Sequence, residues 1–553
     1  MTKLSPTETI KTKSQGLRGT LTDSLKDEHT GSLRDDDQIL VKFHGMYQQD
    51  DRDRREERAQ KKLENLYSFM IRLRIPGGLI SAAQWIAAQH IAGEYSTGII
   101  KITTRQTIQL HGILKRHLKP TLKAFDREKL DSIAACGDVN RNVVCSAHPG
   151  SSSLHAQVHN YADSLSQLLL PKTRAYYEIW LDEERLNPDL VEEDPLYQDH
   201  YLPRKFKIAI AIPPNNDVDV LANDVGLTAV EENGQLLGFN LSVGGGLGTT
   251  HGSADTYPRL GTVLGFISGE ERVHKAVYEV ATIQRDFGNR SERKLSRLKY
   301  TVDRMGIDAF KAELERRCGF TLEAPRPIVF TRREDDYGWQ QDDHGQWHYT
   351  VFVENGRVAD SDQVLLKTGL LKIAETLKCN FRFTCHQNVI IADVANADKA
   401  IIHDLLKKYG LIAGTEQASP TRRNAMACVS FNTCPLALAE AQRYLPSLLD
   451  KIDVLQAKHG LAGEGIILRM TGCPNGCARP YLAEIGFIGT AYGRYNLLLG
   501  GDRNGKRLNK LYKTNLDETA ILAELDDLFG RYSEERQTEE GFGDFIHRIN
   551  LFE

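Results

Sequence analysis

The sequence has no long apolar run, no large excess of either charge and no recognisable nucleotide-binding loop, and each absence excludes a class of function. Without a stretch of about 18 uninterrupted apolar residues, we expect no membrane span. The formal net charge is -4, so no overall basic field favours nucleic acid. The start lacks a charged-then-apolar secretory pattern, and we therefore predict a cytoplasmic protein. The glycine run at 244–248 fits neither a dinucleotide fingerprint nor a phosphate-binding loop.

Length and composition describe a multidomain globular protein. At 553 residues the chain is too long for one ordinary core and predicts about two to four domains. Apolar residues make up 41% and charged residues 26%, which is typical of a globular protein. Nine cysteines in a reducing compartment do not imply disulfides; where they cluster, they indicate a metal site or catalysis.

The first half of the chain alternates predicted strands and helices. Residues 1–38 are polar with mixed charge, and we interpret them as a mobile arm. The charged run 48–58 is typical of a solvated helix face. A strand is predicted over 69–75, a helix over 81–93 and a strand over 98–110, which indicates an α+β protein.

Two short segments recur later in the chain, in the same order. Residues 101–108 align without a gap with residues 382–389, and both follow a helix-like stretch. Residues 238–245 similarly match residues 495–501. Two echoes in register indicate an ancient duplication with pseudo-symmetric halves, between which a cofactor could be held by equivalent strands.

Four cysteines form the most informative pattern. They come as two close pairs, Cys428 with Cys434 and Cys473 with Cys477. Four thiolates supplied in this way suit a 4Fe–4S cluster or a tetrahedral zinc ion. Each pair abuts a predicted helix start, whose free N–H groups would stabilise anionic sulfur. Structural zinc and buried, inert thiols stay open as alternatives.

The helices predicted beside these pairs cover 436–445, opened by Pro435, and 478–485. A second pair, Cys379 and Cys385, has the same spacing as Cys428 and Cys434. It lies in a predicted strand and has no further pair nearby. We therefore interpret Cys379 and Cys385 as structural.

Cations on predicted strands suggest an anion site. Lys205 and Lys207 share one face of a strand, and two adjacent ammonium groups favour an anion between them. Arg141 leads into an apolar strand, and Arg72 and Arg74 share a face of the first strand. Arginine suits forked contacts with oxyanions. The alternative for the lysines is a solvated strand edge.

At this point the chain resembles a known family. The segments that carry the resemblance are His44–Asp53, Asn140–Cys145, Tyr201–Lys207, Ala427–Phe431 and Thr471–Cys477. They are similar to the sirohaem/4Fe–4S family of sulfite and nitrite reductases, and in particular to the haemoprotein (β) subunits of NADPH-dependent assimilatory sulfite reductases. The resemblance extends from about residue 40 to Phe545.

The resemblance implies a role for each matching residue. All four cysteines would ligate the cluster, and Cys477 would also bridge to the sirohaem iron. The residues implied to hold the oxyanion are Arg72, Arg141, Lys205 and Lys207. The residues implied to hold the sirohaem, whose eight carboxylates call for cations, are Lys101, Thr103, Arg105, Gln109, His111, Arg204 and Asn475. Lys101 stands where arginine is expected, and Cys385–His386 replaces small or amide residues, which puts any role of that strand in doubt.

The implied fold is α+β, a three-domain sulfite/nitrite reductase fold with a pseudo-two-fold internal repeat. Residues 1–69 would form an N-terminal arm. Residues 70–133 with 346–415 would form a ferredoxin-like domain of two half-repeats. Residues 134–345 would be the first sirohaem-binding domain, and residues 416–553 the second, which also binds the cluster.

The implied activity is the six-electron reduction of sulfite to sulfide, which feeds cysteine biosynthesis. Because the chain has no flavin or nucleotide motif, the implied electron source is a flavoprotein (α) subunit that carries FAD and FMN and uses NADPH in a hetero-oligomer. A ferredoxin-dependent sulfite or nitrite reductase is the alternative enzyme. A non-catalytic electron carrier or a zinc module is the alternative from another class. Neither nucleic acid nor a membrane is an expected partner.

Overall fold

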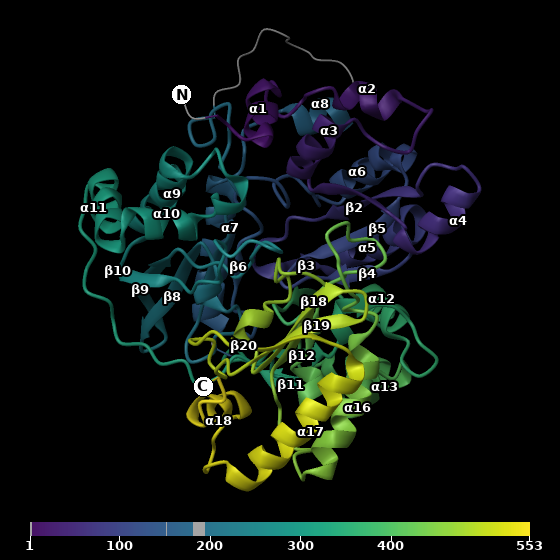
Figure 1. Ribbon diagram of the computed structural model, residues 1–553, viewed down its shortest axis with the longest axis vertical. Coiled ribbons are helices and arrows are strands. Elements are labelled where there is room, and N and C mark those ends of the chain that lie inside the picture. Colours follow the sequence, from purple (N-terminus) through teal and green to yellow (C-terminus); the bar gives the residue numbers. More distant parts are fainter. Residues whose placement is uncertain (1–2, 151, 181–193, 553) are drawn as a thin grey trace.

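The computed structural model of the chain describes residues 3–150, 152–180 and 194–552. Small parts of three predicted regions lie outside the described residues. They are residues 1–2 of the arm, residues 151 and 181–193 of the first sirohaem-binding domain, and residue 553 of the second. Four five-stranded sheets with helices packed around them form the described part (Figure 1). No helix in it is long and apolar enough to cross a bilayer.

Two of the sheets exchange an edge strand. The first has the order β1 (Met46–Asp50), β2 (Tyr67–Arg72), β5 (Ile108–Ile113), β4 (Ile100–Ile102) and β13 (Arg357–Val358). The second has the order β11 (Gly338–Gln341), β12 (Trp347–Val351), β15 (Val389–Val394), β14 (Asn380–Phe383) and β3 (Leu79–Ser81). Strand β3 leaves the first half to pair with β14, and β13 leaves the second half to pair with β4. This reciprocal exchange ties the two halves together.

The other two sheets share one topology. One has the order β10 (Thr262–Ile267), β9 (Gln235–Val243), β8 (Val225–Glu232), β7 (Ile208–Ala211) and β6 (Val144–Cys145). The other has the order β16 (Met426–Ala427), β17 (Leu468–Thr471), β18 (Ile485–Ala491), β19 (Arg494–Leu499) and β20 (Lys510–Leu516). In the first of these sheets, β6 pairs in parallel with β7, and β7 pairs in parallel with β8. In the second, β16 pairs in parallel with β17, and β17 pairs in parallel with β18. The remaining pairings are antiparallel.

The sequence echoes fall at equivalent places in these sheets. The first echo covers the β4–β5 and β14–β15 hairpins, whose turns place Gln106 (φ 51°) and Gln387 (φ 71°) in the left-handed region. The second echo falls on β9 and β19, and its next-to-last residues, Gly244 (φ 80°) and Gly500 (φ 92°), lie in the left-handed region. The strand predicted over 98–110 is therefore two strands, β4 and β5, joined by a tight turn.

Helices pack on each sheet. Those near the two exchanged sheets are α5 (Ala82–Tyr95), α6 (Leu118–Arg127), α12 (Leu366–Thr376) and α13 (Lys399–Lys408). Figure 1 shows α9 (Glu270–Phe287), α10 (Leu298–Met305) and α11 (Ile307–Cys318) beside β8–β10. It also shows α16 (Leu445–Lys458) along α17 (Glu518–Glu535). The further α-helices are α4 (Arg55–Gln60), α7 (Ser152–Leu168), α8 (Ala175–Trp180), α14 (Leu411–Glu416), α15 (Pro420–Arg423) and α18 (Phe542–Arg548).

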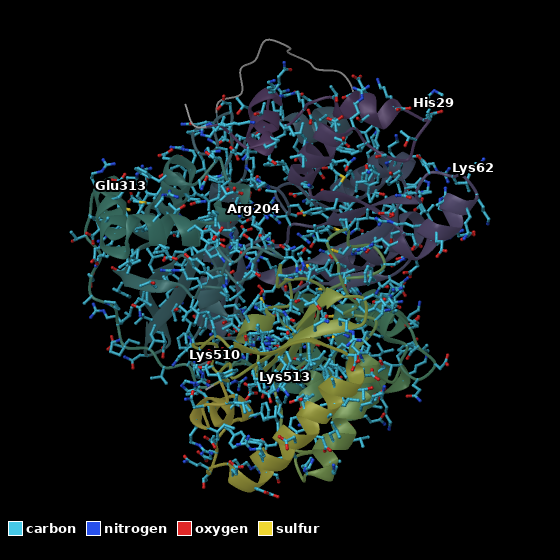
Figure 2. All side chains as sticks on the ribbon, viewed as in Figure 1. His29, Lys62, Arg204, Glu313, Lys510 and Lys513 are labelled. Carbon is cyan, nitrogen blue, oxygen red and sulfur yellow. The ribbon has the colours of Figure 1, made fainter. Side chains whose placement is uncertain are left out.

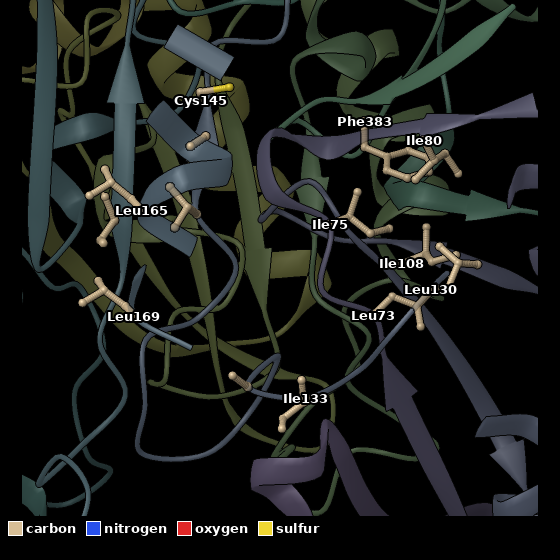
Figure 3. Close-up of a cluster of buried hydrophobic side chains, with 14 of the residues drawn as sticks. Leu73, Ile75, Ile80, Ile108, Leu130, Ile133, Cys145, Leu165, Leu169 and Phe383 are labelled. Atoms are coloured by element: carbon tan, nitrogen blue, oxygen red, sulfur yellow. The ribbon is translucent and has the colours of Figure 1, made fainter. Parts of the chain in front are cut away.

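One large core joins segments from both halves. Ile80 from β3 and Phe383 from β14 belong to it, as does Cys145 at the end of β6 (Figure 3). The indole ring of Trp85 stacks on Phe381 at 5.4 Å between ring centroids. A separate core lies around β17–β19 and α16–α17. The exchanged strands therefore share apolar packing as well as backbone pairing.

The two helices predicted beside the cysteine pairs are wrong. Residues 436–444 form turns, because the N–H groups of Leu438 and Ala439 both donate to the carbonyl of Gly472. These N–H groups tie the first cysteine loop to the second and do not contribute to a helix. The segment 478–485 contains only η8 (Pro480–Leu482) before β18 begins.

The segment predicted as a mobile arm is folded onto the body. It forms α1 (Pro6–Lys13), α2 (Leu21–Lys26) and α3 (Asp35–Leu40). The Lys11 amine is fully buried, donates to the carbonyl of Leu202 at 2.7 Å and lies 2.6 Å from a Glu8 carboxylate oxygen. The sequence hides this contact because Leu202 is far from Lys11 along the chain.

Candidate functional site

The two cysteine pairs lie on neighbouring loops because of strand direction. Cys428 directly follows β16, and Cys473 follows the end of β17. These strands are adjacent and parallel, so their carboxyl ends meet at one edge of the sheet. The loops approach so closely that a Cβ atom at Gly472 would lie 1.9 Å from the hydroxyl oxygen of Ser430. Only glycine fits at this crossing.

The pKa values of three of the thiols, Cys428, Cys434 and Cys473, are raised. Burial raises the pKa of Cys428, and the charges of Cys477, Cys434 and Cys473 raise it further. Burial likewise raises the pKa of Cys434 to about 12, with Cys477 and Cys473 contributing. Holding four such sulfurs as thiolates requires a positive centre among them.

Turn N–H groups assist this site. The backbone N–H of Gly472 donates to the Cys428 sulfur at 3.4 Å, and the side-chain amide nitrogen of Asn475 lies 3.5 Å from the Cys473 sulfur. In the described residues, no group of three or more His, Cys, Asp or Glu side chains is gathered tightly enough to hold a single metal ion. The fit to a larger 4Fe–4S cluster therefore depends on the four cysteine sulfurs that would be its ligands.

A small cavity beside Cys477 collects several of the predicted site residues. Lys205, Lys207, Arg105, Asn475 and Cys477 all line it. The full lining holds five cationic side chains, and none of its described residues is an acid. The cavity volume is about 40 Å³, which is too small for a macrocycle. Binding one would require the long lysine and arginine side chains to adopt other rotamers.

The two lysines are held in an unfavourable electrostatic position. Burial lowers the pKa of Lys205 well below its ordinary value, and the charges of Arg204 and Arg297 add to the shift. Burial also lowers the pKa of Lys207, with Lys205 the next contributor. Both lysines are half-buried and lie among other cations, which disfavours the solvated-edge alternative. An anion is the missing partner of this group.

Arg72 and Arg141 are not among the residues that line this cavity, and they share one hydrogen-bond partner. Both guanidinium groups donate to the carbonyl oxygen of Ala135, at 3.4 Å and 3.2 Å. Arg72 also lies 3.2 Å from the sulfur of Cys136, and Arg141 donates to Gly137 at 2.8 Å. Neither arginine is paired with a carboxylate in these contacts.

The remaining predicted residues are also outside the lining of this cavity. Burial lowers the pKa of Lys101 to about 7, and its amine donates to the carbonyl of Asn355. Burial lowers the pKa of His111 to about 3, and its ring contacts Gln109 at 3.3 Å. The Thr103 hydroxyl accepts from the Arg105 N–H at 3.2 Å. Arg204 lies near the middle of the molecule (Figure 2), and burial lowers its pKa to about 10.

Sequence reasoning missed two cations of the cavity, Arg297 and Arg479. Arg297 precedes α10 and forms an ion pair with Asp224 at 2.8 Å. Arg479 follows Cys477 by two residues, and this nearness to a predicted ligand was the available signal. The interpretation of Cys379 and Cys385 as structural agrees with their burial in apolar clusters.

A larger cavity lies at the equivalent place in the other half, away from the cysteines. Its volume is about 550 Å³, and it is lined by Asn215 and Asp217, which correspond by strand register to Asn475 and Cys477. Glu231 and Asp336 also line it. Volume favours this cavity for a large ligand, but its carboxylates do not suit a polyanion. The cation-lined cavity beside Cys477 is therefore the better candidate for an anionic group.

Two family models match the chain. The nitrite and sulphite reductase 4Fe-4S domain matches residues 161–322. The nitrite/sulfite reductase ferredoxin-like half domain matches twice, over residues 61–127 and 339–409. The two half-domain matches contain most strands of the two exchanged sheets.

Curated relatives match over nearly the full length. The chain is 64% identical to a sulfite reductase (NADPH) hemoprotein beta-component of Leptospira biflexa, over 98% of each chain. It is 54% identical to the protein of that name from Shewanella putrefaciens, over 99% of this chain and 97% of the relative. Among solved structures, the Mycobacterium tuberculosis NirA protein matches with a TM-score of 0.79 at 24% identity, covering 99% of this chain and 96% of that one. This last match establishes the fold alone, and it agrees with the predicted α+β arrangement with ferredoxin-like half domains.

Proposed function

This chain belongs to the nitrite and sulfite reductase family, and we propose that within it the chain reduces sulfite to sulfide as the haemoprotein subunit of an assimilatory enzyme. The observation that carries this proposal is the 64% identity, over 98% of both chains, to a protein named for that activity. The cation-lined cavity beside Cys477 supplies an independent chemical reason, because both sulfite and sirohaem are anionic.

The residues present fit the two cofactors. Four gathered thiols suit the cluster, and the arginines of the cavity beside Cys477 suit the carboxylates of sirohaem. The ligands would be Cys428, Cys434, Cys473 and Cys477, with Cys477 shared between the two groups. When bound, these groups would pass on the donor's electrons and provide the metal centre for the six-electron reduction. The domain division given by the sequence stays a prediction.

The chain's own residues bind sulfite and supply protons. In their hydrogen bonds, Arg72 and Arg141 contact neutral groups and no carboxylate, so their positive charges are available to sulfite oxygens. Lys205 and Lys207 complete the anion site. Because burial lowers the pKa of both lysines, each releases a proton more readily than an exposed lysine. They are therefore the proton donors of this proposal.

The electron donor is a flavoprotein subunit that uses NADPH through FAD and FMN. The support is the name shared by the curated relatives, a beta-component of an NADPH enzyme. We assign the chain to a hetero-oligomer in the cytoplasm, where NADPH and reduced thiols are present. A ferredoxin donor is the alternative that the following measurement also addresses.

The purified chain is expected to reduce sulfite with reduced methyl viologen but to leave NADPH unoxidised, because it contains no nucleotide fingerprint. Absorbance at the NADPH band and the amount of sulfide formed check both halves of this expectation. Adding the flavoprotein should start NADPH oxidation, whereas adding reduced ferredoxin should have a much smaller effect. NADPH turnover by the chain alone would show that a nucleotide site has been overlooked.

A further inference from the structure

A buried carboxylate lies where the two halves of the chain meet, and three arginines surround it. Asp219 is 1% exposed, and its oxygens lie 3.1 Å from Arg333, 2.7 Å from Arg469 and 3.1 Å from Arg479. Asp219 comes from the loop after β7, whereas Arg469 and Arg479 belong to β17 and the loop after it. Burial alone would raise the pKa of Asp219, but the three arginine charges outweigh burial and lower it. Asp219 is therefore ionised.

Asp219 and Arg479 occupy equivalent positions in the duplicated sheets. Each has a left-handed backbone, with φ 48° at Asp219 and φ 58° at Arg479. Asp219 precedes the short helix η5 (Val220–Ala222) that leads to β8, and Arg479 precedes η8, which leads to β18. The two halves thus carry opposite charges at one position, and the two side chains pair with each other.

The arginines around Asp219 outnumber it. One carboxylate faces three guanidinium groups, and Nε and Nη2 of Arg469 and Nε of Arg333 have no hydrogen-bond partner. Nε of Arg479 is close to Asp219 but is not aligned for a hydrogen bond. Buried cations in excess of their counter-ions favour a further anion.

Arg479 is the member of this group that reaches the cavity beside Cys477. Its side chain lines the cavity, whereas Arg333 and Arg469 do not. Its two Nη atoms donate to the carbonyls of Val218 at 3.2 Å and Cys385 at 2.7 Å. Nη2 also contacts the sulfur of Met426 at 3.8 Å. Because each Nη carries two hydrogens, these contacts leave one hydrogen of Nη1 available.

The position of Arg479 favours a carboxylate of the cofactor over sulfite. Arg72 and Arg141, which are proposed to hold sulfite, share Ala135 as a partner. Arg479 contacts a different set of residues, Val218 and Cys385. In the other half, the corresponding residue is the acid Asp219, which does not line the larger cavity, although Asp217 does. An arginine at this position is thus present only beside the cysteines.

We propose that Arg479 binds a carboxylate of the sirohaem and that Asp219, from the other half of the chain, is the positioning residue that holds Arg479 in place. This inference rests on the proposed function, since it needs a polycarboxylate macrocycle in the cavity.

The test compares release of the macrocycle from purified full-length proteins. The variants are Arg479→Gln, Arg479→Lys and Asp219→Asn, and the matched control is Arg333→Gln. Arg333 shares the Asp219 contact and bonds the Leu482 carbonyl but does not line the cavity. The readout is the red-region absorbance that stays with the protein after dilution and gel filtration at increasing times. Urea unfolding of the same proteins reports their stability.

Arg479→Gln is expected to release the macrocycle about 10- to 100-fold faster than wild type, the factor for one lost charge-assisted contact. Arg479→Lys should recover part of this loss, and Asp219→Asn should resemble Arg479→Gln. Arg333→Gln should lose stability yet keep wild-type release. If Arg479→Gln releases the macrocycle no faster than Arg333→Gln, the inference is overturned while the proposed function stands. A wild-type chain without any macrocycle would contradict the proposed function, and this inference with it.

Discussion

Replacement of any one of Cys428, Cys434, Cys473 or Cys477 by serine is expected to remove the iron–sulfur cluster. A hydroxyl is a harder and far more weakly acidic ligand than a thiol, so it does not replace a thiolate on iron. The loss should include about four irons per chain and the broad visible absorption of the cluster. Iron and acid-labile sulfide analysis of the purified variants measures it.

The matched control is Cys385→Ser. Cys385 has the same spacing to Cys379 as Cys434 has to Cys428, but it lies in a buried apolar cluster with Val144 and Phe330. This variant should keep its iron, although it can lose some stability. Retention of the cluster in Cys428→Ser, with its loss in Cys385→Ser, would show that the ligands have been assigned to the wrong residues.

Lys205→Met and Arg141→Ala are expected to keep the cofactors and lose most sulfite turnover. Each removes one charged contact to the oxyanion, which typically costs about 2–4 kcal/mol of transition-state stabilisation. This loss corresponds to a decrease of roughly 30- to 1000-fold in rate. Artificial-donor assays on variants with full sirohaem absorbance measure the effect without the partner subunit.

Arg74→Ala is the control for these variants. Arg74 lies two residues from Arg72, but it forms an ion pair with Asp131 at 2.6 Å and donates to Ser166 at 3.2 Å. Its loss should change stability rather than sulfite kinetics. Unchanged turnover in both Lys205→Met and Arg141→Ala, at full haem occupancy, would return these residues to a structural role.

The parts of the site that could be predicted from the sequence depend on local patterns. The cysteine pairs were visible in the spacing, and parallel β16 and β17 then bring them to one sheet edge. The alternation at Lys205 and Lys207 predicts a shared strand face; both residues lie just before β7, which begins at Ile208, and both line the cavity. The echo at 101–108 and 382–389 predicts a duplication with a repeated strand; the repeated element is a hairpin, whose turn geometry constrains the residue types.

The parts that could not be predicted depend on contacts between distant segments. The exchange of β3 and β13 leaves no periodic signal, since each is a short strand whose partner lies in the other half. The N-terminal arm looked polar, yet Lys11 is buried because Glu8 and Leu202 satisfy it. The helix predicted over 436–445 followed propensity, and the tie between the two cysteine loops prevailed over it.

Electron counting during sulfite turnover tests most directly whether this chain is a sirohaem-dependent sulfite reductase. The purified chain is supplied with sulfite and a known amount of reduced methyl viologen, and the sulfide formed is measured. The expected result is one sulfide for every six electrons consumed, from protein whose spectrum shows the red-region bands of sirohaem. Consumption of electrons without sulfide, or sulfide formation by protein that lacks those bands, would contradict the assignment.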